Sequence, residues 1–315
     1  MEILIICAAG TAALLLALVW IFNMAFYSSP KSRQKPLPLP NGEQYAPHRE
    51  LMASLIKEMG EVPWEEVCIT SFDGTKLFGR YFHAADGAPL QIQFHGYRGT
   101  AFRDFCGGNK LARKFGQNTL LVDQRAHGRS GGSVITFGIK ERYDCLGWAN
   151  YARERFGAET PIILAGVSMG AATVLMASDL ELPENVVGII ADCPYSSPAD
   201  IIRKVCGDMG FPPKLAFPFV SLSARLFGRF DLTSASAAEA VRNTKLPILI
   251  LHGEDDRFVP CEMSGEIAKA CGGRVSRATF PGAGHGLSYM LDPERYEKLT
   301  GEFIEKCTKK FSAAL

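Results

Sequence analysis

The sequence has 315 residues, of which 47% are hydrophobic and 21% charged, and a chain of this length and composition can bury a large core. Its 34 basic and 33 acidic residues give a net charge of +1, and no basic stripe with interleaved aromatic residues is present, which argues against nucleic acid as a partner. The nine cysteines are odd in number and lack metal-ligand spacing, so they indicate free thiols in a reducing compartment.

Residues 3–22 form an uncharged run near the N-terminus. As a helix with a rise of ~1.5 Å per residue, this run is about 30 Å long, which matches the hydrocarbon core of a bilayer. Lys31, Arg33 and Lys35 follow the run while no Lys or Arg precedes it, so the positive-inside rule places the C-terminal bulk in the cytoplasm. The prediction is a single-pass anchor in the cell membrane over residues 1–27. The alternatives are the opposite orientation, a cleaved segment and a helix of a soluble core.

Residues 28–47 contain five prolines among polar and basic residues and predict an extended linker that holds the following domain off the membrane. The remaining residues, 48–315, alternate between short apolar runs and helical patterns. Strands are expected at residues 66–71, 76–82, 91–94, 118–123, 162–165, 187–192, 247–252 and 274–280. Helices are expected at residues 48–59, 102–115, 140–156, 169–180, 261–271 and 293–311.

This alternation is typical of an α/β fold with a mostly parallel sheet of about eight strands and helices on both faces. The stretch 194–242 interrupts the alternation, with Phe, Pro and Leu residues clustered between 211 and 230. An insertion that follows a strand lies at the carboxyl edge of the sheet, so this stretch predicts a helical cap over the site. Its aromatic residues either line an apolar pocket or pack the cap onto the domain.

One serine stands at a turn between a strand and a helix. In Gly166-Val167-Ser168-Met169-Gly170 the serine closely follows the strand at 162–165 and directly precedes the helix at 169–180. Such a sharp turn pushes the hydroxyl out of the sheet edge and needs glycine where strand and helix nearly touch. Ser168 is therefore the candidate nucleophile. A second match to the pattern, with Ser130 in residues 128–132, lies in a polar stretch with no helix behind it.

A serine nucleophile needs an imidazole that takes its proton and a carboxylate that orients the imidazole. Among the six histidines, His285 lies in a Gly-rich loop between the last strand and the last helix, where it can reach the serine. His95 and His252 end strands beside glycines, and His127 lies near Ser130, so these are weaker candidates.

The carboxylate is expected after the strand at 247–252. Glu254, Asp255 and Asp256 are adjacent there, and Asp192 at another strand end is a further candidate. Spacing alone does not choose among these four residues.

From about Val67 onward the chain resembles the α/β-hydrolase superfamily, most of all its serine-aminopeptidase-like or monoacylglycerol-lipase-like branch. The resemblance rests on motifs that occur in the family's order of serine, acid and histidine. They are His-Gly-Tyr-Arg-Gly at 95–99, Asp-Gln-Arg-Ala-His-Gly-Arg-Ser at 123–130, Gly-Val-Ser-Met-Gly at 166–170, His-Gly-Glu-Asp-Asp-Arg-Phe-Val-Pro at 252–260 and Gly-Ala-Gly-His at 282–285.

The resemblance implies roles for three further residues. In the family pattern His-Gly-x-x-Asp-x-x-Val-Pro the working carboxylate stands at the fifth position, which is Asp256 here. An oxyanion hole is implied from the backbone N–H groups of Tyr97 and Met169. No metal or organic cofactor is implied.

Together these features predict a membrane-anchored serine hydrolase that cleaves lipid-like or acyl esters or thioesters through an acyl-enzyme on Ser168. The expected partners are the membrane, through the N-terminal helix, and a small-molecule acyl ester or lipid-like substrate. A peptidase of the aminopeptidase-like branch is the alternative enzyme, with Asp231 and Glu239 as the acidic groups that would hold a substrate ammonium. A non-catalytic protein with this fold is the other alternative, and a broken triad would be its mark.

Overall fold

A computed structural model describes residues 1–33, 39–40 and 42–313, so Lys35, Pro36 and Pro38 of the predicted linker lie outside the described residues. Eight strands form one sheet in the order β1-β2-β4-β3-β5-β6-β7-β8. They are β1 Glu65–Thr70, β2 Lys76–Phe82, β3 Leu90–Phe94, β4 Asn118–Val122, β5 Ile162–Val167, β6 Val186–Asp192, β7 Ile248–Gly253 and β8 Val275–Phe280. β1 and β2 pair antiparallel at one edge, and all pairs from β4 to β8 are parallel. The predicted α/β class and mostly parallel sheet are confirmed.

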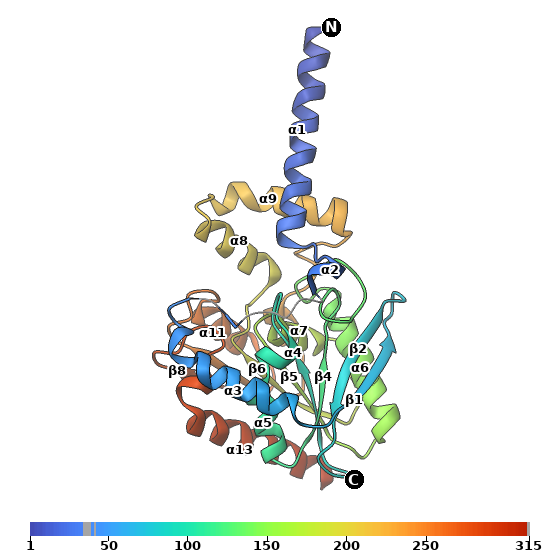
Figure 1. Cartoon of the computed structure of the whole chain (residues 1–315), viewed down its shortest axis with the longest axis vertical. Helices are drawn as coiled ribbons and strands as arrows, with labels where there is room; N and C mark the ends of the chain where they lie inside the picture. Colours follow the sequence, from blue (N-terminus) through green and yellow to red (C-terminus); the bar gives the residue numbers. More distant parts are fainter. Residues whose placement is uncertain (34–38, 41, 314–315) are drawn as a thin grey trace.

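Helices cover both faces of this sheet, whereas α1 projects away from it (Figure 1). The helices are α1 Glu2–Ala25, α2 Pro30–Arg33, η1 Ala46–His48, α3 Arg49–Gly60, α4 Ala101–Asp104, α5 Cys106–Lys114, α6 Glu141–Phe156, α7 Met169–Ala177, α8 Pro198–Asp208, α9 Pro213–Ser223, η2 Ala224–Gly228, α10 Ala237–Ala240, α11 Cys261–Ala270, α12 Ser288–Leu291 and α13 Pro293–Ser312. The single helix predicted at 102–115 was wrong. Phe105 leaves the helical region at φ −114° and ψ 15° and divides the stretch into α4 and α5.

Two hydrophobic cores form because successive strand residues point to opposite faces of the sheet. In β5, Ile162 and Leu164 belong to the core that α6 and α7 cover, whereas Ile163 and Ala165 belong to the core that α3, α5 and α13 cover. A parallel sheet buried on both faces requires continuous apolar strands, and β5 and β6 fit this requirement. Because alternate residues of each strand must enter different cores, a one-residue shift between neighbouring strands would direct side chains into the wrong core. The observed register aligns the carboxyl ends of the parallel strands at one edge of the sheet.

The predicted insertion is helical and lies between β6 and β7. It contains α8, α9, η2 and α10, and α9 lies against the C-terminal part of α1 (Figure 1). Helix α1 is long and apolar enough to cross a membrane, with a mean hydropathy of 2.5 over Ile5–Ala25.

The chain after α1 differs from the extended spacer predicted for residues 28–47. The Ser28 amide donates to the Ser133 carbonyl at 2.9 Å, and the Arg33 guanidinium donates to the Ser130 carbonyl at 2.6 Å. These bonds form because α1 ends against the domain itself and leaves no gap to bridge. The described residues of this segment are therefore attached to the domain, and the boundaries 1–27, 28–47 and 48–315 stay predictions.

Candidate active site

Ser168 stands at the turn from β5 to α7 with φ 55° and ψ −116°. This backbone conformation is strained for a residue with a Cβ, and the packing around the turn holds it there. A Cβ on Gly170 would collide with the Phe94 carbonyl, and one on Gly166 would collide with the Gly170 backbone. The two glycines therefore let the helix approach the sheet closely enough to fix the serine at the strand end.

Ser168, His285 and Asp256 form a continuous chain of contacts, as the sequence predicts. Asp256 follows β7 and His285 follows β8, so both loops leave the sheet at the same edge as β5. His285 Nε2 lies 3.0 Å from Ser168 Oγ, and His285 Nδ1 lies 2.7 Å from Asp256 Oδ2. With its proton on Nδ1, the imidazole donates to the carboxylate and accepts from the serine hydroxyl, which is the arrangement a general base needs.

Every oxygen of Asp256 is engaged. The backbone N–H groups of Phe258 and Val259 donate to Oδ1 at 2.9 and 2.8 Å, and His252 Nε2 lies 3.3 Å from Oδ2 beside the His285 contact. Burial raises the pKa of Asp256, but the hydrogen bonds from His252 and His285 outweigh it and hold the pKa below its ordinary value. Asp256 therefore stays ionised at neutral pH and can stabilise an imidazolium.

The other candidate carboxylates do not contact His285. Asp255 is exposed, and Glu254 accepts from the Thr279 hydroxyl at 2.6 Å. Asp192 accepts from the Tyr296 hydroxyl at 3.1 Å, and burial raises its pKa to about 6. The structure thus brings Asp256, and none of the other three, to the imidazole.

The remaining candidates from the sequence have structural partners. The Gln124 amide donates to His95 Nε2 at 3.1 Å, and the Arg98 amide donates to His127 Nε2 at 3.0 Å. Burial lowers the pKa of both imidazoles, so they stay neutral hydrogen-bonding groups. Ser130 accepts from the Phe78 amide at 2.9 Å and donates to the Asp123 carbonyl, so its hydroxyl is fully used.

The loop that follows β3 lies directly against the serine. A Cβ on Gly96 would lie 3.4 Å from Ser168 Cβ, and the amides of Tyr97 and Met169 donate to no protein acceptor among the described residues. Two unpaired N–H groups beside a serine can receive an oxyanion. Asp104 holds this loop, because its Oδ2 accepts from the Gly96 amide at 2.8 Å. Asp104 belongs to no sequence motif, so sequence reasoning missed it.

A residue of the predicted linker holds the histidine loop. The Tyr45 hydroxyl donates to the His285 carbonyl at 3.0 Å, and burial raises the tyrosine pKa. This contact joins residues 240 positions apart, and nothing in the sequence around Tyr45 indicates it. Tyr45 is therefore a candidate positioning residue that sequence reasoning missed.

One group of side chains near the serine has the composition of a metal site. Ligand atoms of Cys193, Asp256 and His285 lie within 4.8 Å of one another. Burial raises the pKa of the Cys193 thiol well above its ordinary value, and a protonated thiol is a poor ligand. Because Asp256 and His285 already bond each other, the contacts favour the hydrogen-bonded arrangement over metal ligation.

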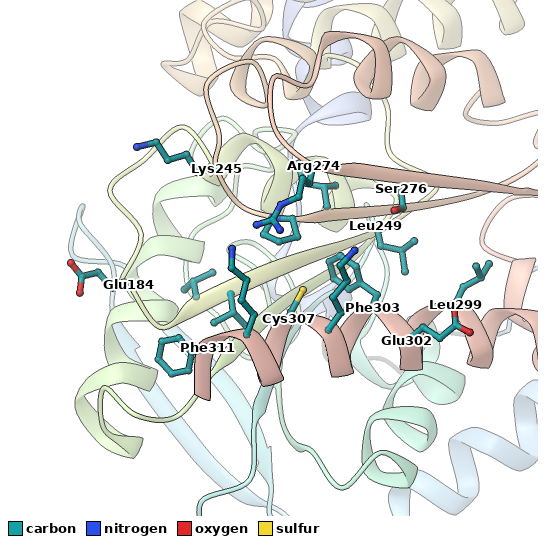
Figure 2. Close-up of a pocket in the computed structure, with 16 residues that line it drawn as sticks. Glu184, Lys245, Leu249, Arg274, Ser276, Leu299, Glu302, Phe303, Cys307 and Phe311 are labelled. Carbon is teal, nitrogen blue, oxygen red and sulfur yellow. The ribbon is translucent and has the colours of Figure 1, made fainter. Parts of the chain in front are cut away.

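A cavity of about 460 Å³ lies at the opposite edge of the sheet. The N-terminal ends of β6, β7 and β8 and the helix α13 line it, and Figure 2 shows Leu249, Phe303 and Phe311 among its apolar side chains with Lys245 and Arg274 beside them. Because Ser168, Asp256 and His285 all follow carboxyl strand ends, this cavity is separate from the candidate active site.

The fold and the site define a class of protein, and comparison with known families identifies it. The model of the alpha/beta hydrolase family matches residues 94–299, and the chain belongs to this family. The match runs from the last residue of β3 into the first turns of α13, and it includes every residue of the candidate site except Tyr45. The family resemblance predicted from the motifs is confirmed.

Individual relatives are distant. The chain is 24% identical over 191 residues to YqkD of Bacillus subtilis strain 168, described as an uncharacterized protein, in a match covering 60% of this chain and 63% of YqkD. It is 24% identical over 222 residues to the protein bem46 of Schizosaccharomyces pombe, covering 70% of this chain and 68% of bem46. Among solved structures, the esterase Pf2001 of Pyrococcus furiosus has a TM-score of 0.64 at 22% identity, covering 87% of this chain and 99% of that one. Such a likeness shows the fold alone.

Proposed function

We propose that the chain is a membrane-anchored serine hydrolase that cleaves lipid-like or acyl esters or thioesters through an acyl-enzyme on Ser168. The observation that carries this proposal is the unbroken contact from Ser168 Oγ to His285 at 3.0 Å and from His285 to Asp256 at 2.7 Å. A fold shared with an esterase of Pyrococcus furiosus and membership of the alpha/beta hydrolase family support the same reaction class.

Each contact of the site has a role in the proposed mechanism. His285 Nε2 takes the proton of Ser168 as the hydroxyl oxygen attacks the substrate carbonyl, while ionised Asp256 stabilises the imidazolium. The amides of Tyr97 and Met169 donate to the oxyanion, and one such donor contributes about 3 kcal/mol to transition-state stabilisation. His285 then protonates the leaving group, and a water activated by the same imidazole releases the acyl group from Ser168.

The proposed location rests on α1 and on the cysteines. A helix of this length and hydropathy fits a single membrane span, and Lys31 and Arg33 follow it, which favours a cytoplasmic domain. All nine cysteines are free, as expected in a reducing compartment. An anchor that holds the enzyme at a membrane favours lipid-like or acyl substrates.

The peptidase alternative has less support. It needs an acidic group in the inserted segment that is free to hold a substrate ammonium. Asp231 is ion-paired with Arg225 at 2.7 Å, and Glu239 is ion-paired with Arg242 at 3.0 Å, so both carboxylates already have cationic partners. The ester hydrolase is therefore the better-supported function.

A fluorophosphonate probe tests the proposal on the full-length protein. We expect covalent labelling of the wild type and none of Ser168→Ala, with Ser130→Ala as the matched control that keeps labelling. Hydrolysis of a series of esters of increasing acyl length, compared with aminoacyl amides, then separates esterase from peptidase. An unlabelled, folded wild type would support the non-catalytic alternative, and turnover of the amides alone would favour the peptidase.

A further inference from the structure

One side of the C-terminal third of α1 packs against the protein. Leu18 in this helix is 1% exposed, and Phe26, which directly follows the helix, is 0% exposed. The ring of Phe22 lies 5.7 Å from that of Phe227 in η2, and the ring of Phe26 lies 5.2 Å from that of Phe230. Helix α1 also contacts α9, which crosses it near this end (Figure 1). The helix is therefore attached to the inserted segment along its side, not only through the chain that follows it.

Polar contacts fix the same end of α1. The Tyr97 hydroxyl donates to the Ala25 carbonyl at 2.9 Å. The Arg98 guanidinium donates to the Met24 and Tyr27 carbonyls at 2.9 and 3.1 Å, where it satisfies the free carbonyls at a helix end. Together with the ring contacts, these bonds set the position of α1 relative to α9 and η2.

If α1 spans a bilayer, its length determines how close α9 and η2 lie to the hydrocarbon core. The part that precedes the docked face, residues 3–17, is about 22 Å long at ~1.5 Å per residue, whereas the hydrocarbon core of a bilayer is ~30 Å thick. A spanning α1 must therefore place Leu18 to Phe22 inside the hydrocarbon as well. The α9–η2 elements that lie beside this part of α1 are then at the level of the bilayer.

The exposed surface of α9 and η2 is apolar in a regular stripe. Leu215, Phe219, Leu222 and Leu226 are spaced i, i+4, i+7 and i+11, and they are 69%, 47%, 40% and 52% exposed. Leu215, Phe219 and Leu222 share one face of α9 and Leu226 follows in the π-helical turn η2; exposed apolar side chains in such a row form a patch that marks an interaction surface. We call these four residues the α9–η2 surface.

The charges around this surface fit a lipid surface. Between residues 209 and 230 the chain has three basic residues, Lys214, Arg225 and Arg229, and no acidic residue, with Asp208 and Asp231 at the two borders of this stretch. All three basic side chains are exposed; Arg225 is ion-paired with Asp231 at 2.7 Å, so Lys214 and Arg229 are the cations that can face anionic lipid. Basic residues that flank an apolar helix face are typical of helices lying in the interface of a membrane with anionic lipids.

We propose that the α9–η2 surface lies in the interfacial region of the bilayer that α1 crosses, and that the Ser168 site takes membrane-resident lipid esters directly from that bilayer. This inference rests on the proposed function, because it requires α1 to span a membrane and Ser168 to be the nucleophile. The insertion carrying α9 follows β6, whose neighbour β5 ends at Ser168, so the immersed surface lies on the same side of the sheet as the site.

Quenching by brominated lipid tests the position of the surface. Full-length protein with Trp20→Phe is reconstituted into vesicles of anionic lipid brominated on the upper acyl chain, with either Leu222→Trp or Leu51→Trp added. Leu51 is the matched control. It is an exposed leucine of α3, a helix that packs on the opposite hydrophobic core from the one that α9 contacts. We expect roughly half of the added emission at residue 222 to be quenched, as for a side chain at the headgroup boundary, and none at residue 51.

The wild-type protein separates the failure of the surface from the failure of the anchor. If Trp20 of the wild type is quenched but a tryptophan at residue 222 is not, α1 is in the membrane and the α9–η2 surface is not, which overturns the inference alone. If Trp20 is not quenched either, the anchor and the inference both fail. Quenching at residue 222 and residue 51 alike would point to non-specific adsorption and would also overturn the inference.

Kinetics test the route of the substrate. The double variant Leu222→Glu, Leu226→Glu is compared with Leu51→Glu on a long-chain ester embedded in vesicles and on a short-chain ester in solution. We expect a roughly tenfold loss on the embedded ester and less than about twofold on the soluble one, because two carboxylates are expelled from the interface. Equal losses on both substrates, or none on either, would overturn the inference. Activity remaining in Ser168→Ala would instead count against the proposed function.

Discussion

Replacing Asp256 by asparagine changes the chemistry of the site with little change in its shape. Two backbone N–H groups, from Phe258 and Val259, donate to Oδ1, so the carbonyl oxygen of an asparagine must occupy that position. Its NH2 group then faces His285 Nδ1, where the carboxylate accepted a hydrogen bond at 2.7 Å. Two donors cannot bond each other, so the imidazole must move its proton to Nε2 and lose the ability to accept from Ser168.

The expected cost is large because the wrong tautomer cannot act as the base. An asparagine in the place of such an aspartate lowers kcat by about 10⁴-fold, which corresponds to about 5 kcal/mol of transition-state stabilisation. Steady-state hydrolysis of a soluble short-chain ester measures kcat and KM separately. We expect the loss in kcat with KM changed little, since Asp256 is buried at 6% exposure and is placed to contact the imidazole.

Asp192→Asn is the matched control for this variant. Asp192 is a second buried carboxylate at a neighbouring strand end, but its bond is to Tyr296 and not to His285. We expect its kcat to stay within about threefold of the wild type, since no atom of the reaction contacts it. An Asp256→Asn enzyme that keeps a tenth or more of wild-type kcat, or an Asp192→Asn enzyme that loses as much as Asp256→Asn, would refute the assignment.

Three further outcomes are expected. Burial raises the pKa of Asp192 from 3.8 to about 6, so ionisation of this carboxylate lowers the stability of the wild type as pH rises through this range. The free energy of urea unfolding of Asp192→Asn should therefore exceed that of the wild type by at most about 3 kcal/mol at pH 8 and by almost nothing at pH 4. Tyr45→Phe removes the bond to the His285 carbonyl, and kcat should fall about fivefold with KM unchanged; a change in KM alone would contradict a positioning role. Ser130→Ala should lose about 1–3 kcal/mol of stability yet keep fluorophosphonate labelling, in contrast to Ser168→Ala.

The strands that the sequence predicted share one physical property: each is a short stretch of buried or alternating apolar residues bounded by turn residues. β2 was predicted at its observed bounds because Lys76 and Phe82 stand between clear turns, and the buried β6 was predicted to within one residue. The break between α4 and α5 was missed because the apolar pattern continues across Phe105 while its backbone does not. The triad contacts followed from motifs, since a tight turn limits which residues can occupy it.

The contacts that the sequence did not reveal are single polar bonds between distant segments and the docking of α1. The Tyr97 and Arg98 side chains could not be assigned to the end of α1, because their partners are backbone carbonyls, which every residue has. The side of α1 that packs on the domain, which contains the buried Leu18, cannot be recognised in the sequence because the helix is apolar all round. A stripe that faces protein and a stripe that faces lipid then have the same composition. In such a helix the composition does not show whether the domain is held away from the bilayer or in contact with it. The length of the helix that precedes the docked part, compared with the thickness of the hydrocarbon core, distinguishes these two arrangements.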